Sequence, residues 1–523
     1  MQMPASRTIP GLIDELSGRF PDREALVGSG RRYTYRELRS AVREVAQGLH
    51  AQGVRQADKV AILMGNRPEW VIAALAITHL GAVMVGVNTW ATTRELEQIL
   101  HDSDTTVLIA ADRFLKYDYL AMLAEIAPRA RRLPLLRRVV CVADTNHGGT
   151  MPFHELIAGG AHVPASVIDA AGAAVKGPDV AYLLYTSGST SAPKGVQLQH
   201  YALIENMWQI GERMHVTERD RLWLAVSLFW GLGCENALFN LLTHGGCVVL
   251  QEHFEPGEAL KLIAEERCTV FYGTPNMALA LAEHPERGRH DLSSLRTGGT
   301  IGTPEQIKRV VDLGVHEICN IYGLTETYGN CAVTDAHDPL EVRLQCVGQP
   351  LEGVAIRVID IEKGISLPAG EVGEIRVKGY VTCGYYKRDS ADAFDDEGWF
   401  RTGDLGFLDD AGRLHFRGRI KEIVKTGGIN VAPVEVEEIL MSHPDIKAAF
   451  VIGVPDARRD EVLAALVVRR PGASVALATI ETHCRSALAA YKVPRLFRFV
   501  EERELPLTVT GKLQKNRLRE FFD

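Results

Sequence analysis

The chain has 523 residues, of which 46% are hydrophobic and 24% charged, an ordinary balance for a globular protein. At about 150 residues per domain, this length exceeds a single core and predicts three or four subdomains. The 58 basic residues are outnumbered by 66 acidic ones, and the net charge of −8, with no concentrated basic run, argues against nucleic-acid binding.

The spacing of the cysteines and the two terminal segments indicate in which cellular compartment the protein is expected. The nine cysteines, spread from Cys141 to Cys484, form no Cys-x-x-Cys pair, so we expect buried thiols in a reducing compartment. The N-terminal segment lacks the apolar core of a secretory signal, and the last four residues form no targeting signal. The longest apolar run, residues 71–87, is interrupted by polar residues and glycine, which predicts a helix and a strand and no membrane span. We therefore expect a cytoplasmic protein.

Short apolar strands alternate with helical stretches through most of the first four hundred residues. We expect strands at 60–64, 82–87 and 106–110, and helices at 70–80 and 94–100. This alternation predicts an α/β fold with parallel sheets covered by helices on both faces. Short strands at 355–359, 373–377 and 412–416 predict a small β subdomain, and a compact α+β unit follows. We expect a large N-terminal domain over 1–418 and a small, mobile C-terminal domain over 419–523.

Residues 185–196 read Tyr-Thr-Ser-Gly-Ser-Thr-Ser-Ala-Pro-Lys-Gly-Val and follow an apolar run that predicts a buried strand. The segment after this strand offers backbone N–H groups, hydroxyl donors and one cation, a combination that suits the binding of a polyphosphate. The residues that carry this chemistry are Thr186, Ser187, Gly188, Ser189, Thr190 and Lys194. Walker A spacing is absent. A flexible Gly/Ser linker is the alternative, which the preceding strand and the Pro-Lys-Gly ending disfavour.

Residues 322–326, Tyr-Gly-Leu-Thr-Glu, follow another apolar run. Thr325 and Glu326 thus place a hydroxyl and a carboxylate at the end of a strand. Such oxygen ligands suit Mg²⁺, which usually arrives with nucleotide phosphates. The alternative is an ordinary helix N-terminus.

Two further segments carry isolated charges in turns. Asp404 lies between glycines in Gly-Trp-Phe-Arg-Thr-Gly-Asp-Leu-Gly, where a carboxylate can accept both hydroxyls of a ribose. The alternative is an ordinary turn aspartate. Lys512 lies in Thr-Gly-Lys near the C-terminus, where most lysines are only surface charge.

Taken together, these motifs resemble those of the adenylate-forming (AMP-binding) superfamily, which comprises acyl- and aryl-CoA synthetases, amino-acid adenylation domains and luciferases. The blocks occur in family order between residues 185 and 512. For the nucleotide, the resemblance implies a phosphate loop at 186–190, a Mg²⁺ ligand at Glu326, a ribose contact from Asp404 and a further contact from Arg419. It implies adenine contacts from Gly302, Thr303, Asn320, Tyr322 and Gly323. For the C-terminal domain, it implies a hinge at Lys421, a thiol tunnel along Gly427 and Gly428, and an adenylation lysine at Lys512. Two positions depart from the family pattern: Ser191 replaces a customary glycine, and Glu422 replaces a customary aspartate.

The acyl pocket is expected between the helix that follows 227–233 and the loops at 272–277, 298–303 and 327–331. Trp230 stands where amino-acid adenylation domains often carry an aspartate, and an indole offers no counter-charge for an α-amino group. Trp230 also coincides with the family's aromatic gate, the alternative being a plain core tryptophan. Small residues in the expected lining leave volume for a bulky apolar acid. The predicted lining is Trp230, Gly231, Cys234, Gly329 and Asn330.

These observations predict an ATP-dependent carboxylate–CoA ligase that forms an acyl-AMP and then an acyl-CoA thioester. The expected acid is aromatic, alicyclic or a medium-to-long acyl chain, and the expected cofactors are ATP, Mg²⁺ and coenzyme A. The alternative is a free-standing adenylating enzyme that loads a carrier protein. A homodimer is compatible with the sequence.

Overall fold

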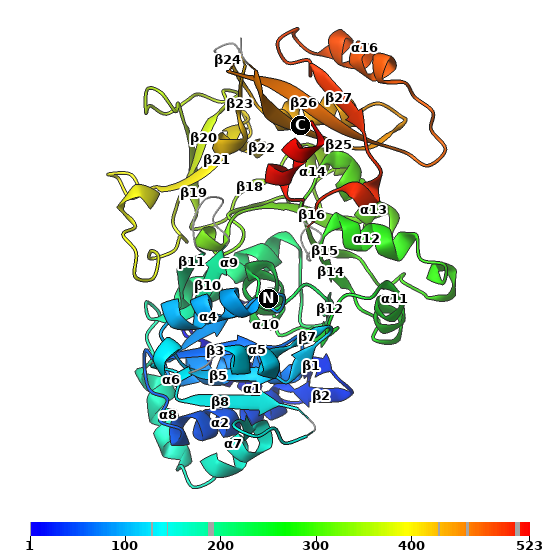
Figure 1. The fold of residues 1–523 in the computed structure, drawn as a ribbon. Helices are drawn as coiled ribbons and strands as arrows, with labels where there is room; N and C mark the ends of the chain where they lie inside the picture. Colours follow the sequence, from blue (N-terminus) through cyan, green and yellow to red (C-terminus); the bar gives the residue numbers. More distant parts are fainter. Residues whose placement is uncertain are drawn as a thin grey trace. The chain divides into compact units, whose positions relative to one another are not determined.

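The computed structural model describes residues 2–126, 129–143, 145–186, 193–426, 429–456, 460–507 and 513–522 (Figure 1). The chain forms two compact units. Unit 1 comprises Met1–Ala355 and Val377–Phe400, and unit 2 comprises Ile356–Arg376 and Arg401–Asp523. The division between residues 418 and 419 stays a prediction.

Unit 1 contains a seven-stranded sheet in the order β11-β10-β4-β3-β5-β8-β9. Its strands are β3 (Lys59–Leu63), β4 (Val83–Gly86), β5 (Thr105–Ala111), β8 (Arg138–Val142), β9 (Met151–Pro152), β10 (Val180–Thr186) and β11 (Lys194–Gln199). All pairs are parallel except β10 with β11. The strands predicted at 60–64, 82–87 and 106–110 are therefore confirmed.

A nine-stranded sheet of unit 1 has the order β18-β17-β16-β15-β14-β12-β13-β1-β2. Its strands are β1 (Glu24–Gly28), β2 (Arg31–Thr34), β12 (Arg221–Leu224), β13 (Cys247–Leu250), β14 (Val270–Tyr272), β15 (Thr297–Thr300), β16 (Glu317–Tyr322), β17 (Ala332–Val333) and β18 (Gln349–Pro350). The central strands from β13 to β16 pair in parallel. The short strands β6 (Arg113–Phe114) and β7 (Tyr117–Asp118) form a separate hairpin.

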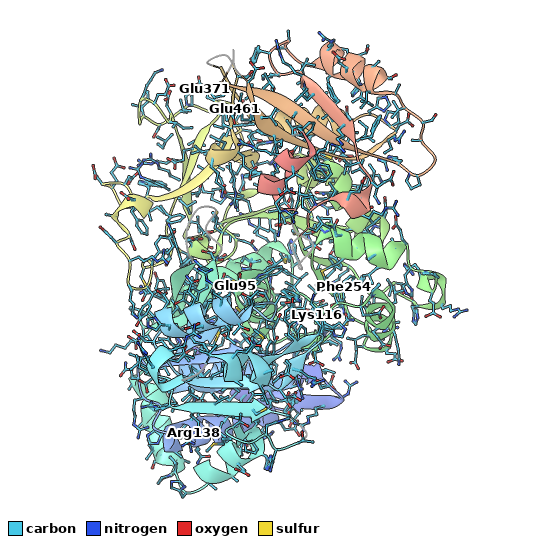
Figure 2. The ribbon with its side chains drawn as sticks, in the orientation of Figure 1. Glu95, Lys116, Arg138, Phe254, Glu371 and Glu461 are labelled. Atoms are coloured by element: carbon cyan, nitrogen blue, oxygen red, sulfur yellow. The ribbon has the colours of Figure 1, made fainter. Side chains whose placement is uncertain are left out.

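Helices connect and cover these strands, as the parallel arrangement requires. Those of unit 1 are α1 (Ile9–Arg19), α2 (Tyr35–Ala51), α3 (Pro68–His79), α4 (Thr93–Asp102), α5 (Tyr119–Glu125), α6 (Arg129–Arg132), α7 (Phe153–Gly160), α8 (Ala165–Ala174), α9 (His200–Arg213), α10 (Leu238–Thr243), α11 (Pro256–Glu265), α12 (Pro275–Ala282), α13 (Pro304–Asp312) and α14 (Leu340–Gln345), with short helical turns η1 (Leu232–Ala237), η2 (Arg287–Arg289), η3 (Thr325–Thr327) and η4 (Ala391–Ala393). Helix α4 begins with a capping box in which Glu95, labelled in Figure 2, bonds the Thr92 backbone.

The apolar run at 71–87 forms helix α3 and strand β4, as predicted. All twelve residues of α3 are buried, because the helix contacts β3 and β4 of one sheet and β1 of the other. A helix that is covered on every side is mostly apolar, and α3 buries only Glu69, Thr78 and His79 as polar side chains. No single helix in the described ranges is long and apolar enough to cross a membrane, although α7 and α8, bent by 101°, pass that test as a pair.

Unit 2 carries most of the four-stranded sheet β19-β20-β21-β22 and a five-stranded sheet built around β25 and β26. The elements are β19 (Ala355–Ile359), β20 (Gly373–Lys378), β21 (Phe400–Leu408), β22 (Leu414–Arg419), β23 (Val424–Thr426), β24 (Ile429–Val431), α15 (Pro433–Met441), β25 (Ile446–Asp456), β26 (Asp460–Arg469), α16 (Leu477–Ala487) and β27 (Leu496–Phe499), with turns η5 (Ile420–Glu422), η6 (Glu502–Glu504) and η7 (Lys515–Phe521). Alternate residues of β26 enter two different cores. Leu463 and Ala465 pack with α15 and α16, and Val462 and Ala464 pack with Leu518 on the other face.

The α/β fold class and the small β subdomain agree with the prediction. None of the nine cysteines, all of which lie in the described ranges, forms a disulfide, and all but Cys383 are buried.

Candidate active site

The loops predicted to form the site follow neighbouring parallel strands. Strands β14, β15 and β16 end at Tyr272, Thr300 and Tyr322, and their residues lie side by side in register. The carboxyl ends of parallel strands meet at one edge of a sheet, which is where ligands bind in open α/β folds. The predicted pocket loops at 272–277, 298–303 and 327–331 therefore share this edge.

The predicted phosphate loop is anchored by a pair of antiparallel strands. Thr186 ends β10 and lies opposite Lys194, which begins β11. The Arg388 guanidinium donates a 2.8 Å hydrogen bond to the carbonyl of Pro193, which steadies the return of the chain. Ser187, Gly188, Ser189, Thr190 and the unusual Ser191 lie outside the described residues, so their roles stay predictions.

Tyr385 connects the two charged groups of unit 1 that the sequence analysis assigned to phosphate and metal. Its hydroxyl donates to Oε1 of Glu326 at 3.0 Å, and Lys194 Nζ lies 4.9 Å from the centre of its ring. Burial and then the Glu326 charge raise the pKa of Tyr385, which keeps its hydroxyl a donor. Sequence reasoning did not select Tyr385, because nothing local links it to a glutamate 59 residues earlier.

Glu326 is held at the end of β16 by main-chain contacts as well. The residue lies in η3 with Thr325 and is 9% exposed, and its carbonyl accepts a 2.6 Å hydrogen bond from the Thr382 N–H. Among the described residues, only His215, Asp335 and His337 bring three metal-ligand atoms within 4.8 Å of one another, and Glu326 is not among them. A lone carboxylate fits an ion that takes its remaining oxygen ligands from phosphates and water.

The predicted adenine side combines a buried amide with a close backbone approach. Asn320 is 3% exposed, and its Nδ2 donates to the Cys346 carbonyl at 2.9 Å, while its Oδ1 has no partner among the described residues. A Cβ on Gly323 would lie 2.2 Å from the Gly329 carbonyl oxygen, so only glycine fits after Tyr322.

Gly302 and Thr303 have a structural role that is visible directly. Thr303 is the N-cap of α13 and forms a capping box with Gln306. A Cβ on Gly302 would meet the Gln306 side chain at 2.7 Å. These contacts fix the start of the helix, and contacts of both residues with a nucleotide stay predictions.

Three aromatic rings pack against one another where the gate is predicted. The Trp230 ring lies 5.3 Å from Phe229 and 5.9 Å from Trp90, and Trp90 lies 5.4 Å from Phe229 in an edge-to-face contact. Trp230 remains partly exposed. Sequence reasoning missed Trp90, although it lies just after β4, the neighbour of β10 in the seven-stranded sheet, and β10 leads into the predicted phosphate loop.

The predicted acyl lining begins in a π-helical turn. Residues Leu232–Ala237 form η1, a rare geometry that is frequent at functional sites. Cys234 is fully buried there. Gly329 has φ +78°, and a Cβ on it would lie 2.2 Å from the Asn236 side chain. Asn330 donates from Nδ2 to the Tyr272 hydroxyl at 2.8 Å, so its amide joins two of the predicted loops.

Unit 2 brings together two of its predicted residues. Asp404 and Arg419 are paired across β21 and β22, and Arg419 Nε lies 3.3 Å from Oδ1 of the aspartate. Lys421 is exposed in η5. Gly427, Gly428 and Lys512 lie outside the described residues.

Lys515, three residues beyond the predicted adenylation lysine, is held by two carboxylates of unit 2. Its Nζ lies 3.1 Å from Glu422 and 3.3 Å from Glu437. Glu437 also accepts a 2.8 Å hydrogen bond from the Val451 N–H. Glu437 was not selected from the sequence, because nothing in its spacing shows that its side chain turns inward.

Comparison with known proteins covers nearly the whole chain. The AMP-binding enzyme family matches residues 13–386, and the AMP-binding enzyme C-terminal domain matches residues 435–512. The 3-[(3aS,4S,7aS)-7a-methyl-1,5-dioxo-octahydro-1H-inden-4-yl]propanoyl:CoA ligase of Mycobacterium tuberculosis is 36% identical over 522 residues, covering 98% of this chain and 99% of that protein.

Two solved structures are similar along the same length. The anthranilate CoA ligase AuaEII in complex with anthranoyl-AMP has a TM-score of 0.85 and 28% identity, covering 98% of this chain and 97% of that one. ATP-bound MatB from Rhodopseudomonas palustris has a TM-score of 0.85 and 29% identity, covering 98% and 99%. The predicted family is confirmed: this chain contains both the main and the C-terminal domain of the AMP-binding enzymes and belongs to that family.

Proposed function

We propose that the protein is an ATP-dependent, AMP-forming carboxylate–CoA ligase. The observation that supports the proposal most directly is that Tyr385 contacts both Lys194 and Glu326 in unit 1. The chain also matches both domains of the family. Relatives and structural neighbours of nearly full length bear the names of CoA ligases, which supports coenzyme A as the acceptor.

In the first half-reaction the substrate carboxylate attacks the α-phosphate of ATP, which yields acyl-AMP and pyrophosphate. The loop at 186–190, Lys194 and Lys512 would hold phosphate charge that grows in the transition state. Glu326 would hold Mg²⁺, which would neutralise phosphate charge when bound. Tyr385 fixes the Glu326 carboxylate from the protein side, and Asp404 would accept the ribose hydroxyls.

In the second half-reaction the thiol of coenzyme A attacks the acyl-AMP carbonyl and releases AMP. Splitting the reaction activates a poor electrophile before the thiol arrives. We propose that Lys421 lies at a hinge about which the C-terminal domain moves between the two steps, that Gly427 and Gly428 line the thiol path, and that Trp230 separates that path from the acyl site.

The substrate class follows from the acyl lining. The rings of Trp90, Phe229 and Trp230 offer an apolar wall at the predicted acyl site. The space beside Gly231 and Gly329 is filled by the side chains of Glu235 and Asn236. The relatives include enzymes named for an alicyclic propanoate and for anthranilate. A bulky, largely apolar acid therefore fits better than acetate or propionate. Carrier-protein loading stays the alternative to coenzyme A, and a homodimer and a cytoplasmic location stay predictions.

The test is ATP–pyrophosphate exchange across aliphatic, aromatic and polycyclic acids, followed by thioester formation with coenzyme A alone. The expected result is exchange with a bulky apolar acid and CoA-dependent release of AMP. Exchange without turnover of coenzyme A would contradict the acceptor, and a best kcat/KM for acetate or propionate would contradict the substrate class.

A further inference from the structure

The π-helical turn η1 contains a carboxyl group that the mechanism above does not use. Glu235 is 0% exposed, and neither of its carboxyl oxygens has a hydrogen-bond partner among the described residues. Burying a polar group without a partner is costly, and most buried polar atoms in folded proteins are therefore bonded. An orphaned carboxyl at a site thus indicates a partner that binds from outside.

The carboxyl group of Glu235 lies against the predicted acyl lining. A Cβ on Gly231 would meet the three atoms of this carboxyl group at 2.8–3.0 Å, so the glycine makes room for it. Gly231 follows directly after Trp230. The space left by the glycine at 231, next to Trp230, is therefore occupied by the polar carboxyl group of Glu235.

Neighbouring elements turn further polar groups toward the same region. Burial raises the pKa of Tyr182 on β10, of Tyr272 on β14 and of Tyr328 beyond η3, and Glu235 is the last of the contributors to each shift. The Tyr182 hydroxyl and the Oδ1 atom of Asn236 are also buried without partners in the part of the chain that the structure describes. Tyr182, Glu235 and Asn236 thus each carry a buried, unsatisfied polar atom.

The charge state of Glu235 limits what can bind. Burial and then Glu326 raise its pKa well above the usual value, which favours the neutral acid over an ionised carboxylate buried without a counter-charge. A neutral carboxyl group donates one hydrogen bond and accepts others, which matches a hydroxyl or a ketone oxygen. An ammonium group would have to be desolvated itself and would need an ionised partner.

We propose that Glu235 is a specificity-determining residue that binds a hydroxyl or ketone oxygen carried on the hydrocarbon part of the acyl group. The inference rests on the proposed function and narrows its substrate from a bulky apolar acid to a bulky acid with one oxygen substituent away from the carboxylate. The preference arises because only such an acid satisfies the buried carboxyl group.

The first test compares matched acids by ATP–pyrophosphate exchange: cyclohexanecarboxylate and larger alicyclic acids, each with a hydroxyl, a ketone, an amino group or no substituent. In the wild type, at least one hydroxy or keto acid should exceed its parent by about tenfold or more in kcat/KM. Glu235→Met should reduce that ratio to near unity, and Glu235→Gln should keep most of it, because the amide also donates and accepts. The proposal would be overturned if the unsubstituted or the amino-substituted acid had the highest kcat/KM. It would also be overturned if Glu235→Met kept the wild-type ratio of kcat/KM between the hydroxy or keto acid and its parent.

The second test needs no substrate and compares unfolding of the ligand-free protein in urea. Glu235→Met removes an unsatisfied carboxyl group and should raise the unfolding midpoint at pH 7. Glu437→Met is the matched control, because that buried glutamate is bonded to Lys515 and to the Val451 N–H, and its loss should lower the midpoint. A lower midpoint for Glu235→Met would show that the carboxyl group has a structural partner and would overturn the inference. Absence of exchange with every acid would instead contradict the proposed function.

Discussion

The hydroxyl of Tyr385 donates to Glu326 at 3.0 Å while the same ring lies 4.9 Å below the ammonium group of Lys194. One side chain therefore spaces the cation predicted to bind phosphate from the carboxylate predicted to bind Mg²⁺. Neither charge needs the other as a direct partner, so both remain available to a ligand. Tyr385 is accordingly a positioning residue.

Tyr385→Phe should lower kcat for acyl-AMP formation and raise the Mg²⁺ concentration needed for half-maximal rate. Loss of a hydrogen bond to a charged group is worth about 1.5–3 kcal/mol, which corresponds to roughly ten- to hundredfold. Pyrophosphate release measured over a range of Mg²⁺ concentrations checks the prediction. Tyr386→Phe is the control, because that neighbouring hydroxyl bonds Asp104 instead. Equal effects of the two variants would argue against the assigned role.

Lys512→Ala should abolish acyl-AMP formation while leaving thioester formation from supplied acyl-AMP largely intact. Removal of a charge that stabilises the transition state typically slows a step by roughly 100- to 1,000-fold. The two half-reactions are measured separately, by pyrophosphate exchange and by consumption of synthetic acyl-AMP with coenzyme A. Lys308→Ala, at an exposed lysine of α13, should leave both unchanged. Equal loss of the two half-reactions in Lys512→Ala would refute the proposed alternation.

Gly323→Ala should destabilise the protein, since the new Cβ would lie 2.2 Å from a backbone oxygen that no side-chain rotation can move. Overpacking of this kind costs roughly 1–3 kcal/mol. Gly18→Ala, in α1, meets nothing within 4 Å and should stabilise by about 0.5–1 kcal/mol through helix propensity. Urea midpoints of both variants check the prediction, and an unchanged midpoint for Gly323→Ala would show that the loop relaxes.

The stability of Glu235→Gln relative to the wild type should increase between pH 5 and pH 7. The folded-state pKa of Glu235 is raised above the usual value of 4.5, so the folded protein keeps a proton that the unfolded chain releases in this window. Each pH unit then disfavours the wild-type fold by up to about 1.4 kcal/mol, whereas glutamine does not titrate.

The groups around Glu235 are Tyr182, Tyr272, Tyr328 and Cys234, whose pKa values burial raises, and Glu326. The tyrosines and the thiol therefore stay neutral across this range. Urea unfolding of both proteins at pH 5, 6 and 7 measures the difference. A constant difference would mean that Glu235 titrates normally.

Features that depend on local pattern were predictable from the sequence. The strand before residue 186 and the apolar run that became α3 and β4 follow from hydrophobic periodicity and length. The predicted loops 272–277, 298–303 and 327–331 meet at one edge because their strands are parallel neighbours. The charged residues of the motifs were assigned their roles mainly through the resemblance to the family, because each is compatible with an ordinary turn, helix terminus or surface position on its own.

Contacts between distant segments were not predictable in the same way. The contacts of Tyr385 with Glu326 and of Trp90 with Trp230 join loop and turn residues that are far apart in sequence. The inward direction of Glu235 also escaped prediction, because an ordinary helical period leaves it ambiguous. Side-chain direction in η1 depends on a backbone geometry that no residue type there specifies.

The π-turn over Leu232–Ala237 widens the helix by about one residue relative to α-helical pitch. Deleting a single residue within it would restore ordinary pitch and leave the helix after Ala237 in place, so that only the side chains of the turn itself would change direction. The polarity of the acyl site is thus encoded in chain length as well as in composition. A deletion that changes no other amino acid could convert a site that demands an oxygen substituent into one that rejects it.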